Sequence, residues 1–246
     1  NYRSLNDGER ERRNIMKVCK RCLLPQTYDT IKIAEDCSSC NICQASEIKE
    51  QTTDWNKKKK MLDQIIKKYK GKFEYDCIIP FSGGKDSCYA LYYLVKEYNI
   101  KPLVVRFDSG FMRPIQAENI RKVTKKLGVD FISFTPNWKV VKQLMIESFM
   151  EKTDFCWHCH AGVYSYPLRI AVKYNTPLVF WGESLDLLVG GYDFNNGSID
   201  FEDETRFHNI RILGLKADEM YERLTKKGLK IDKRDLMSYT YPTTVE

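Results

Sequence analysis

The residues from 82 to 87 combine glycines, hydroxyls, a cation and a carboxylate, a set suited to binding phosphate. They are Ser82, Gly83, Gly84, Lys85, Asp86 and Ser87. The glycines allow the backbone to approach phosphate oxygens and to direct N–H groups at them, and a following helix adds its positive N-terminal end. Lys85 supplies a mobile positive charge, and Asp86 supplies a carboxylate of the kind that holds Mg²⁺. The segment therefore predicts a nucleotide-binding loop.

Two alternatives exist for this segment. A Walker A loop has a longer spacing between its first glycine and its Gly-Lys pair, so the segment is not of that type. Ser-Gly-Gly is also ordinary turn chemistry. A short apolar run at 77–81 precedes it, however, and the residues that follow place apolar side chains on one face of a helix: Cys88, Leu91, Tyr92 and Val95. A strand before and a helix after favour phosphate binding.

Two C-x-x-C pairs near the N-terminus have the spacing of a four-thiolate metal site. They are Cys19 with Cys22 and Cys37 with Cys40. Each pair presents its sulfurs to one ion, and the two pairs complete the tetrahedron that zinc prefers. Because such a site leaves no open position, the predicted Zn²⁺ is structural. Cys43 extends the second pair and could replace one ligand, and reduced free thiols are the alternative.

The elements that position these residues follow from alternating short apolar runs and amphipathic stretches. Strands are predicted at 77–81, 103–107, 131–134 and 178–181, and helices from Asp54 and near 114–127, 138–149, 163–174 and 217–226. This order predicts an α/β fold with a doubly wound, Rossmann-like parallel sheet. Ligands of such sheets bind beyond the carboxyl ends of the strands, where the 82–87 loop falls. Pro80 is expected at the exit of its strand, because proline removes a ladder donor.

Three regions are expected along the chain. Residues 1–16 are polar and aperiodic, which indicates a disordered leader with Met16 as a natural start. Residues 17–50 form a small zinc-ribbon-like element whose folding energy comes from its metal, since it has little apolar sequence. Residues 51–246 form the nucleotide-binding domain.

Composition narrows the class of protein. The chain is 43% hydrophobic, enough for a full core, and no stretch approaches the ~18 apolar residues of a membrane span. Nine cysteines without a signal peptide indicate a reducing, cytoplasmic location, where C-x-x-C pairs serve metal binding or catalysis. The net charge of +7 is concentrated in residues 1–71. That excess suits a nucleic-acid arm, but Lys57–Lys60 is more simply the solvated face of a helix.

The 82–87 loop after a strand resembles the PP-loop ATP pyrophosphatase superfamily, whose members cleave ATP between its α and β phosphates and adenylate a substrate oxygen. Within it, the chain is similar to N-acetyl sugar amidotransferases of the WbpG/PseA type, from O-antigen and flagellin sugar pathways. Besides the loop, the resemblance is carried by Cys19–Pro25, Cys156–His160 and Trp181-Gly182-Glu183-Ser184. It covers about Met16 to Pro242. Family members extend further at the C-terminus, which implies that this chain is truncated.

The resemblance implies roles for further residues. The end of the second strand, Arg106-Phe107-Asp108, would hold the nucleoside, although Asp108 also reads as an ordinary strand-ending residue. The strand that ends at Gly182 would lie across the site, so that Glu183 meets Mg²⁺, pyrophosphate or substrate. The residues implied to bind ATP are Ser82, Gly83, Gly84, Lys85, Asp86, Ser87, Phe107, Asp108 and Gly182. Those implied to be catalytic are Lys85, Asp86, Cys156, Cys159 and Glu183.

The segment Cys156-Trp157-His158-Cys159-His160 holds several potential ligands that cannot all reach one ion easily. We expect it in a loop before a helix, at the carboxyl edge of the sheet. Three active-site roles remain open: an anchor for a metal or an iron–sulfur cluster, a reactive thiol pair, or a substrate-shaping loop with Trp157 stacked on a sugar. A purely structural role is the fourth. Cys77 and Cys88 are expected to pack as small apolar side chains.

The implied reaction converts an acetamido group of a nucleotide- or lipid-linked sugar into an acetamidino group, through an O-adenylyl imidate and ammonia. No glutaminase signature is visible, so ammonia is expected from a separate glutaminase through a channel-forming subunit. The alternative is a tRNA-thiolating enzyme of the same superfamily. Such enzymes often hold an iron–sulfur cluster on three cysteines, and no convincing third cysteine accompanies Cys156 and Cys159. A sugar enzyme without a nucleic-acid partner is therefore preferred, and a non-catalytic zinc-ribbon interaction protein is a distant third.

Overall fold

The computed structural model describes residues 17–26, 31–33, 38–182 and 207–242. The chain forms two compact units: Asn1–Lys59 with Ser184–Ile199, and Lys60–Glu183 with Asp200–Glu246. The predicted leader, residues 1–16, lies outside the described residues. No described helix combines the length and the apolar character that crossing a membrane requires.

A parallel sheet forms the centre of the second unit. Its strands are β1 (Cys77–Pro80), β2 (Pro102–Phe107) and β3 (Asp130–Phe134), in the order β1-β2-β3. The predicted fourth strand is present as a single parallel bridge between Val179 and Ile78. The Ile78 N–H donates to the Leu178 carbonyl at 2.8 Å. Pro80 is the last residue of β1, as expected.

The helices were largely predicted. They are α1 (Asn41–Thr52), α2 (Trp55–Tyr69), α3 (Lys85–Tyr98), α4 (Pro114–Leu127), α5 (Trp138–Lys152), α6 (Trp157–Lys173) and α9 (Ala217–Lys226), with the π-helix η2 (Phe207–Arg211) and the 3₁₀-helix η3 (Lys233–Tyr239). Local signals fixed several ends. Asp54 Oδ1 accepts from the Lys57 N–H at 2.9 Å before α2, and Gly128 ends α4 with φ of 66°.

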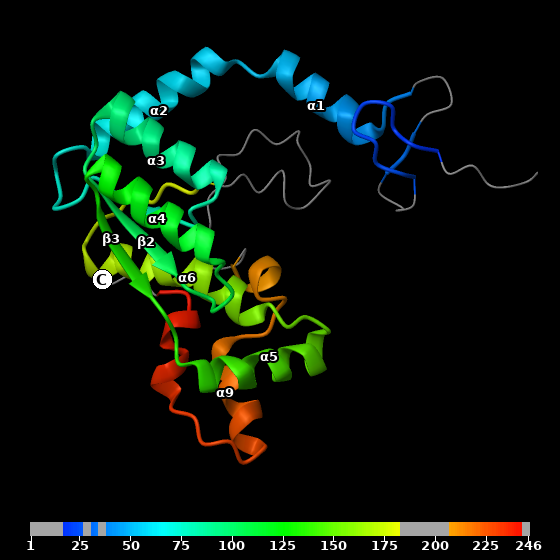
Figure 1. The fold of residues 1–246 in the computed structure, drawn as a ribbon, viewed down its shortest axis with the longest axis vertical. Coiled ribbons are helices and arrows are strands. Elements are labelled where there is room, and N and C mark those ends of the chain that lie inside the picture. The colour runs from blue at the N-terminus through cyan, green and yellow to red at the C-terminus, as the bar shows by residue number, and fades with distance from the viewer. Residues whose placement is uncertain (1–16, 27–30, 34–37, 183–206, 243–246) are drawn as a thin grey trace, which may run out of the picture. The chain divides into compact units, whose positions relative to one another are not determined.

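Helices cover both faces of the sheet, which confirms the predicted α/β class (Figure 1). Side chains alternate between faces along a strand. Ile79 and Val104 therefore pack on the side of α3 and α4, whereas Ile78 and Leu103 pack against α6. All four are almost fully buried. The strands read as continuous apolar runs because both of their faces are covered.

The segment 156–160 was predicted as a loop, and this was wrong. Cys156 is the N-cap of α6, and the four residues after it form the first turn. Asp154 Oδ1 accepts from the Cys156 N–H at 2.7 Å, and the Cys156 carbonyl accepts from the His160 N–H at 3.0 Å. The predicted helix began at 163, directly after Gly162, because glycine disfavours a helix interior.

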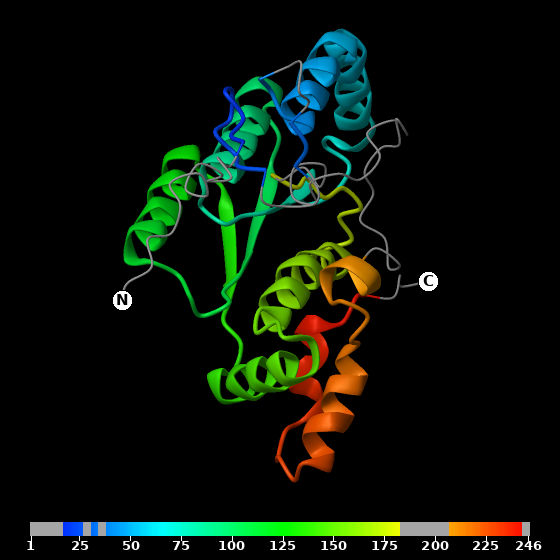
Figure 2. The ribbon, with the colours of Figure 1, turned by 90° about the vertical axis from the view of Figure 1, so that its right-hand side faces the viewer.

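A second apolar core joins α5, α6, η2, α9 and η3, which lie together in Figure 2. Trp157 and Tyr239 are at its centre, 2% and 1% exposed. The Trp157 Nε1–H donates to the Leu215 carbonyl at 2.8 Å. This burial corrects the expectation that Trp157 could stack on a sugar, because neither face of its indole is available.

The described part of the first unit is built around cysteines. Cys19, Cys40 and Cys43 are buried together with Ile31. Antiparallel bridges join Val18 to Pro25 and Ile33 to Cys40, and α1 begins directly after Cys40. So few apolar side chains give little burial energy, and folding around a bound ion stays a prediction for this element.

Candidate functional site

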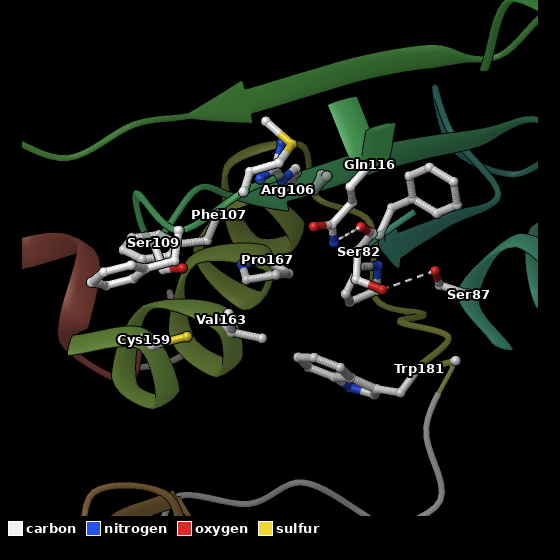
Figure 3. A pocket seen from close by; sticks show the side chains of 16 residues that line it. Ser82, Ser87, Arg106, Phe107, Ser109, Gln116, Cys159, Val163, Pro167 and Trp181 are labelled. Atoms are coloured by element: carbon white, nitrogen blue, oxygen red, sulfur yellow. Dashed lines mark hydrogen bonds between the residues drawn. The ribbon is translucent and has the colours of Figure 1, made fainter. Parts of the chain in front are cut away.

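A pocket of about 300 Å³ opens at the carboxyl ends of β1 and β2 (Figure 3). It lies within the second unit. Its walls are the end of β1 and the loop after it, the end of β2 and the loop after that, one face of α6, and the segment after the fourth-strand bridge. Residues that line it include Ser82, Ser87, Arg106, Phe107, Ser109, Gln116, Cys159, Val163, Pro167, Trp181 and Gly182.

The 82–87 loop turns sharply into α3 at one wall of this pocket. Gly83 has φ of +75°, a conformation that side chains with a Cβ rarely adopt. Ser82 Oγ lies 3.1 Å from Ser87 Oγ and accepts from the Gly84 N–H at 3.2 Å. Gly84 is the N-cap of α3 and supplies no side-chain cap. The first N–H groups of α3 are therefore free of a capping side chain, as an anion-binding helix end requires.

Side chains of α4 hold the carbonyl groups of this loop. The Gln116 amide donates to the Ser82 carbonyl at 2.7 Å, and the Asn119 amide donates to the Gly83 carbonyl at 2.6 Å. With the carbonyls turned to α4, the loop can direct its N–H groups to a ligand. Neither amide was predicted from the sequence. In the sequence they appear only as polar residues of the predicted helix after the second strand. Nothing there distinguishes them from residues that face the solvent.

Gly182 lies against the loop from the opposite side. A Cβ built on Gly182 would be 2.8 Å from Ser87 Cα, closer than side-chain atoms approach a backbone. The segment after the fourth-strand bridge therefore touches the start of α3 through its backbone and lies directly beside the loop. The expected part of Gly182 in ATP binding stays a prediction. Glu183, its predicted catalytic residue, lies outside the described residues.

Lys85 and Asp86 are the first two residues of α3 and do not line the pocket. The Lys85 side chain is 90% exposed, and its Nζ lies 3.0 Å from Asp86 Oδ1. An exposed pair of this kind contributes little to stability. Both side chains are therefore free to move onto a bound ligand, and their catalytic roles remain predictions.

Arg106 and Asp108 form an ion pair at the end of β2. Arg106 Nη2 donates to Asp108 Oδ1 at 3.2 Å, and the Gly110 N–H donates to the same oxygen at 3.0 Å. Burial lowers the pKa of the Arg106 guanidinium, and the Asp108 carboxylate opposes this shift. Arg106 and Phe107 line the pocket, whereas Asp108 holds Arg106 and the turn behind it. Asp108 is thus placed to support the wall, and its ATP-binding role remains a prediction.

The first turn of α6 is bonded to the loop after β2. His158 Nε2 lies 3.3 Å from the Ser109 carbonyl, which can only accept, so this nitrogen carries the proton. Burial lowers the pKa of His158 and keeps it neutral. Burial also raises the pKa of Cys159, and a hydrogen bond with Ser109 opposes that shift. Cys159 lines the pocket as a protonated thiol, which is a weak nucleophile.

Cys156, unlike Cys159, is not among the residues that line the pocket. It caps α6, and burial raises the pKa of its thiol. In the described part of the chain, the only residues that bring three or more potential ligand atoms within reach of one ion are N-terminal cysteines. The segment 156–160 therefore does not assemble a metal site from its own side chains.

Four cysteines of the first unit do form such a site. They are Cys19, Cys22, Cys40 and Cys43, whose sulfur atoms all lie within 4.8 Å of one another. The Cys19–Cys43 and Cys22–Cys40 sulfur pairs are 3.8 and 3.6 Å apart. The N–H groups of Cys22 and Cys40 donate to Cys19 Sγ at 3.5 and 3.2 Å. Three of the four predicted ligands are thus brought together with Cys43, and Cys37 lies outside the described residues.

Gly162 allows Phe107 to pack on α6, and a substitution there gives a stability test. A Cβ on Gly162 would lie 2.2 Å from Phe107 Cζ. We expect Gly162→Ala to destabilise the fold by about 1–3 kcal/mol through overpacking, less a helix-propensity gain of up to about 1 kcal/mol. Urea unfolding measures the change. The double variant with Phe107→Leu should lose less than the two single changes added together. A more stable Gly162→Ala variant would contradict the packing.

Known proteins with a distant similarity to this chain include two enzymes and a protein without an assigned function. No family model matches it. A protein of Methanocaldococcus jannaschii described as uncharacterised is 28% identical over 193 residues, which span 76% of this chain and 64% of that protein. An NH₃-dependent NAD synthetase from Campylobacter jejuni is 14% identical with a TM-score of 0.42, over 79% of this chain and 100% of the other. The U34-tRNA thiolase NcsA from Methanococcus maripaludis, with its [4Fe–4S] cluster, is 18% identical with a TM-score of 0.36, over 70% and 56%.

Proposed function

We propose that the chain is an enzyme that cleaves ATP between the α and β phosphates and transfers AMP to a substrate oxygen. The observation that carries the proposal is the 82–87 loop, which joins β1 to an uncapped helix at the pocket and has its carbonyls tied to α4. Such a loop offers backbone N–H groups to a phosphate. Its sequence matches the PP-loop pattern.

The pocket walls suggest how ATP would lie. The phosphates would contact the loop N–H groups and the hydroxyls of Ser82 and Ser87. The nucleoside would extend towards Arg106 and Phe107 at the end of β2. Asp86 is the carboxylate of the described loop that would hold Mg²⁺, which when bound neutralises phosphate charge. Lys85 would supply a further positive charge to the transferring phosphate, so that catalysis rests on positioning and electrostatics.

For the substrate, we propose an acetamido sugar and ammonia. The acetamido oxygen attacks the α-phosphorus and pyrophosphate leaves, giving an O-adenylyl imidate. Ammonia then adds to the imidate carbon and AMP leaves, so an acetamidino group remains. Cluster-dependent tRNA thiolation is the alternative. An argument for the sugar substrate is that Cys159 is the one cysteine among the described residues that line the pocket, whereas such a cluster is held by three. Ammonia would come from a separate glutaminase through a second subunit.

For the cysteine site, we propose a structural Zn²⁺ bound by Cys19, Cys22, Cys40 and Cys43. Zinc–thiolate bonds of about 2.3 Å in a tetrahedron place sulfur atoms about 3.8 Å apart. The two measured sulfur–sulfur distances, 3.6 and 3.8 Å, agree with that edge. The N–H groups that donate to Cys19 Sγ stabilise a thiolate there, as a metal ligand requires.

The function is tested by giving the purified chain ATP, Mg²⁺, ammonium and a panel of UDP-N-acetylhexosamines. We expect AMP and pyrophosphate, and a sugar product that mass spectrometry finds lighter, because NH has replaced oxygen. The pKa of ammonium is near that of a lysine amine, ~10, so little free ammonia is present near neutral pH. The rate of the reaction should therefore rise with pH. Glutamine should not replace ammonium. A heavier, sulfur-containing product made from tRNA and a sulfur donor would instead identify a thiolase.

A further inference from the structure

Three side chains from separate segments form a layered stack that ends at the pocket. The guanidinium carbon of Arg211, in η2, lies 3.6 Å from the centre of the Tyr164 ring. Tyr164, on α6, stacks in turn on Trp181 with ring centres 5.0 Å apart and planes 30° apart. Arg211 and Tyr164 are 8% and 7% exposed, whereas Trp181 is only partly buried and lines the pocket. In Figure 3 the indole borders the pocket below Val163 and Ser82.

This stack holds the indole in place before any ligand arrives. A guanidinium over an aromatic face is attracted by the ring quadrupole, and more strongly when both groups are desolvated. One face of Trp181 is covered by Tyr164, and the residue after it, Gly182, is packed against the backbone of Ser87. A ring that is already ordered costs little entropy when a ligand packs on it.

The strand order indicates which of the two substrates, ATP or the acceptor, lies beside Trp181. Ile78 of β1 pairs with Leu103 of β2 on one side and with Val179 on the other. The 82–87 loop follows β1, so it lies between the end of β2 and the segment of Trp181. If phosphates occupy the loop and the nucleoside takes the side of β2, the remaining side belongs to the acceptor.

We propose that the face of Trp181 turned away from Tyr164 is the stacking platform for the acceptor, and that it takes the C–H face of a pyranose ring. The negative face of an aromatic ring attracts such partially positive hydrogens. The assignment rests on the proposed function, which places ATP on the other side of the loop. It replaces Trp157, whose indole is buried in the core, as the aromatic residue that meets a sugar.

The probe is the methyl α-glycoside of N-acetylglucosamine, which carries no nucleobase. Its binding is followed by saturation-transfer NMR with and without the uncleavable analogue α,β-methylene-ATP. The wild-type protein should transfer saturation to the protons of one pyranose face. Trp181→Leu should weaken glycoside binding roughly two- to tenfold, the effect of losing one aromatic partner, whereas Trp181→Phe keeps most of it. Trp55→Leu, an exposed tryptophan of α2, is the matched control and should change nothing.

The affinity for α,β-methylene-ATP, measured by calorimetry on the same variants, separates the two proposals. It should be equal in all of them. Failure of the wild-type protein to bind the analogue would refute the ATP site. The stacking platform would still be tested by the glycoside-binding measurement made without nucleotide. Equal glycoside binding by the wild type and Trp181→Leu, or none by either, overturns the platform. Displacement of the glycoside by uridine alone would show that the indole face takes a base instead.

Discussion

Replacing Lys85 by alanine is expected to lower the rate of AMP formation by about 10²–10³-fold, the cost of losing one preorganised group that stabilises transition-state charge. The Lys85 side chain is 90% exposed and contacts only Asp86 among the interactions described for it, at 3.0 Å. It contributes almost nothing to the core, so the thermal unfolding of the variant should match that of the wild type. The measurement is AMP released per enzyme under saturating ATP, acceptor and ammonium.

Two controls show whether the Lys85 effect belongs to the loop. Lys85→Arg keeps a positive charge at the same place and should retain more activity than alanine does. Lys96→Ala removes an exposed lysine from the last turn of the same helix and should be neutral. Near-wild-type AMP formation by Lys85→Ala would show that the cation has no part in phosphate transfer, and equal losses in both alanine variants would point to a general charge effect.

The second large effect is expected at the cysteine site. Cys43→Ser should reduce the zinc content from one ion per chain to a small fraction of that, because a tetrahedral site loses one of its four thiolates. Elemental analysis measures the zinc content. The first unit should lose structure with the ion, since metal binding supplies most of the folding energy of such elements. Amide hydrogen exchange would show this as faster exchange in α1.

Cys37→Ser is the matched control for the cysteine site. Cys37 belongs to the ligand set expected from spacing alone, whereas Cys43 belongs to the set that the structure brings together. The structure therefore predicts full zinc content in Cys37→Ser and loss in Cys43→Ser. The reverse result would restore the spacing-based set. Iron in place of zinc in the wild-type protein would refute the identity of the ion and leave the four ligands in place.

The fold class could be predicted from the sequence because the features that indicate it are local. Apolar runs marked β1 and β2, Pro114 and Gly128 marked the ends of α4, and the glycines of the 82–87 loop marked the turn between strand and helix. These features depend on neighbouring residues and on backbone conformations that few residues can adopt. The prediction that this loop binds phosphate rests on the same local signals, and the Lys85 experiment tests it.

The composition of the pocket was decided by tertiary structure. Gln116 and Asn119 reach the loop only because the crossover after β2 brings α4 beside it. Trp157 and Trp181 cannot be told apart by residue type. Trp157 enters the core that α5 and α6 form with segments after residue 206. Trp181 is held at the pocket by its stacking on Tyr164, which Arg211 covers in turn. Which face of an aromatic ring is covered depends on long-range packing.

The same division applies to the metal ligands. Spacing indicated a four-thiolate site, because each C-x-x-C pair turns its sulfurs to one side. It could not choose between Cys37 and Cys43, which lie at equal distances in sequence from Cys40. The choice depends on where the backbone bends. Helix α1 begins at Asn41 and carries Cys43 in its first turn to within 3.8 Å of Cys19. Sequence determined the kind of site, and the position of a helix decided its members.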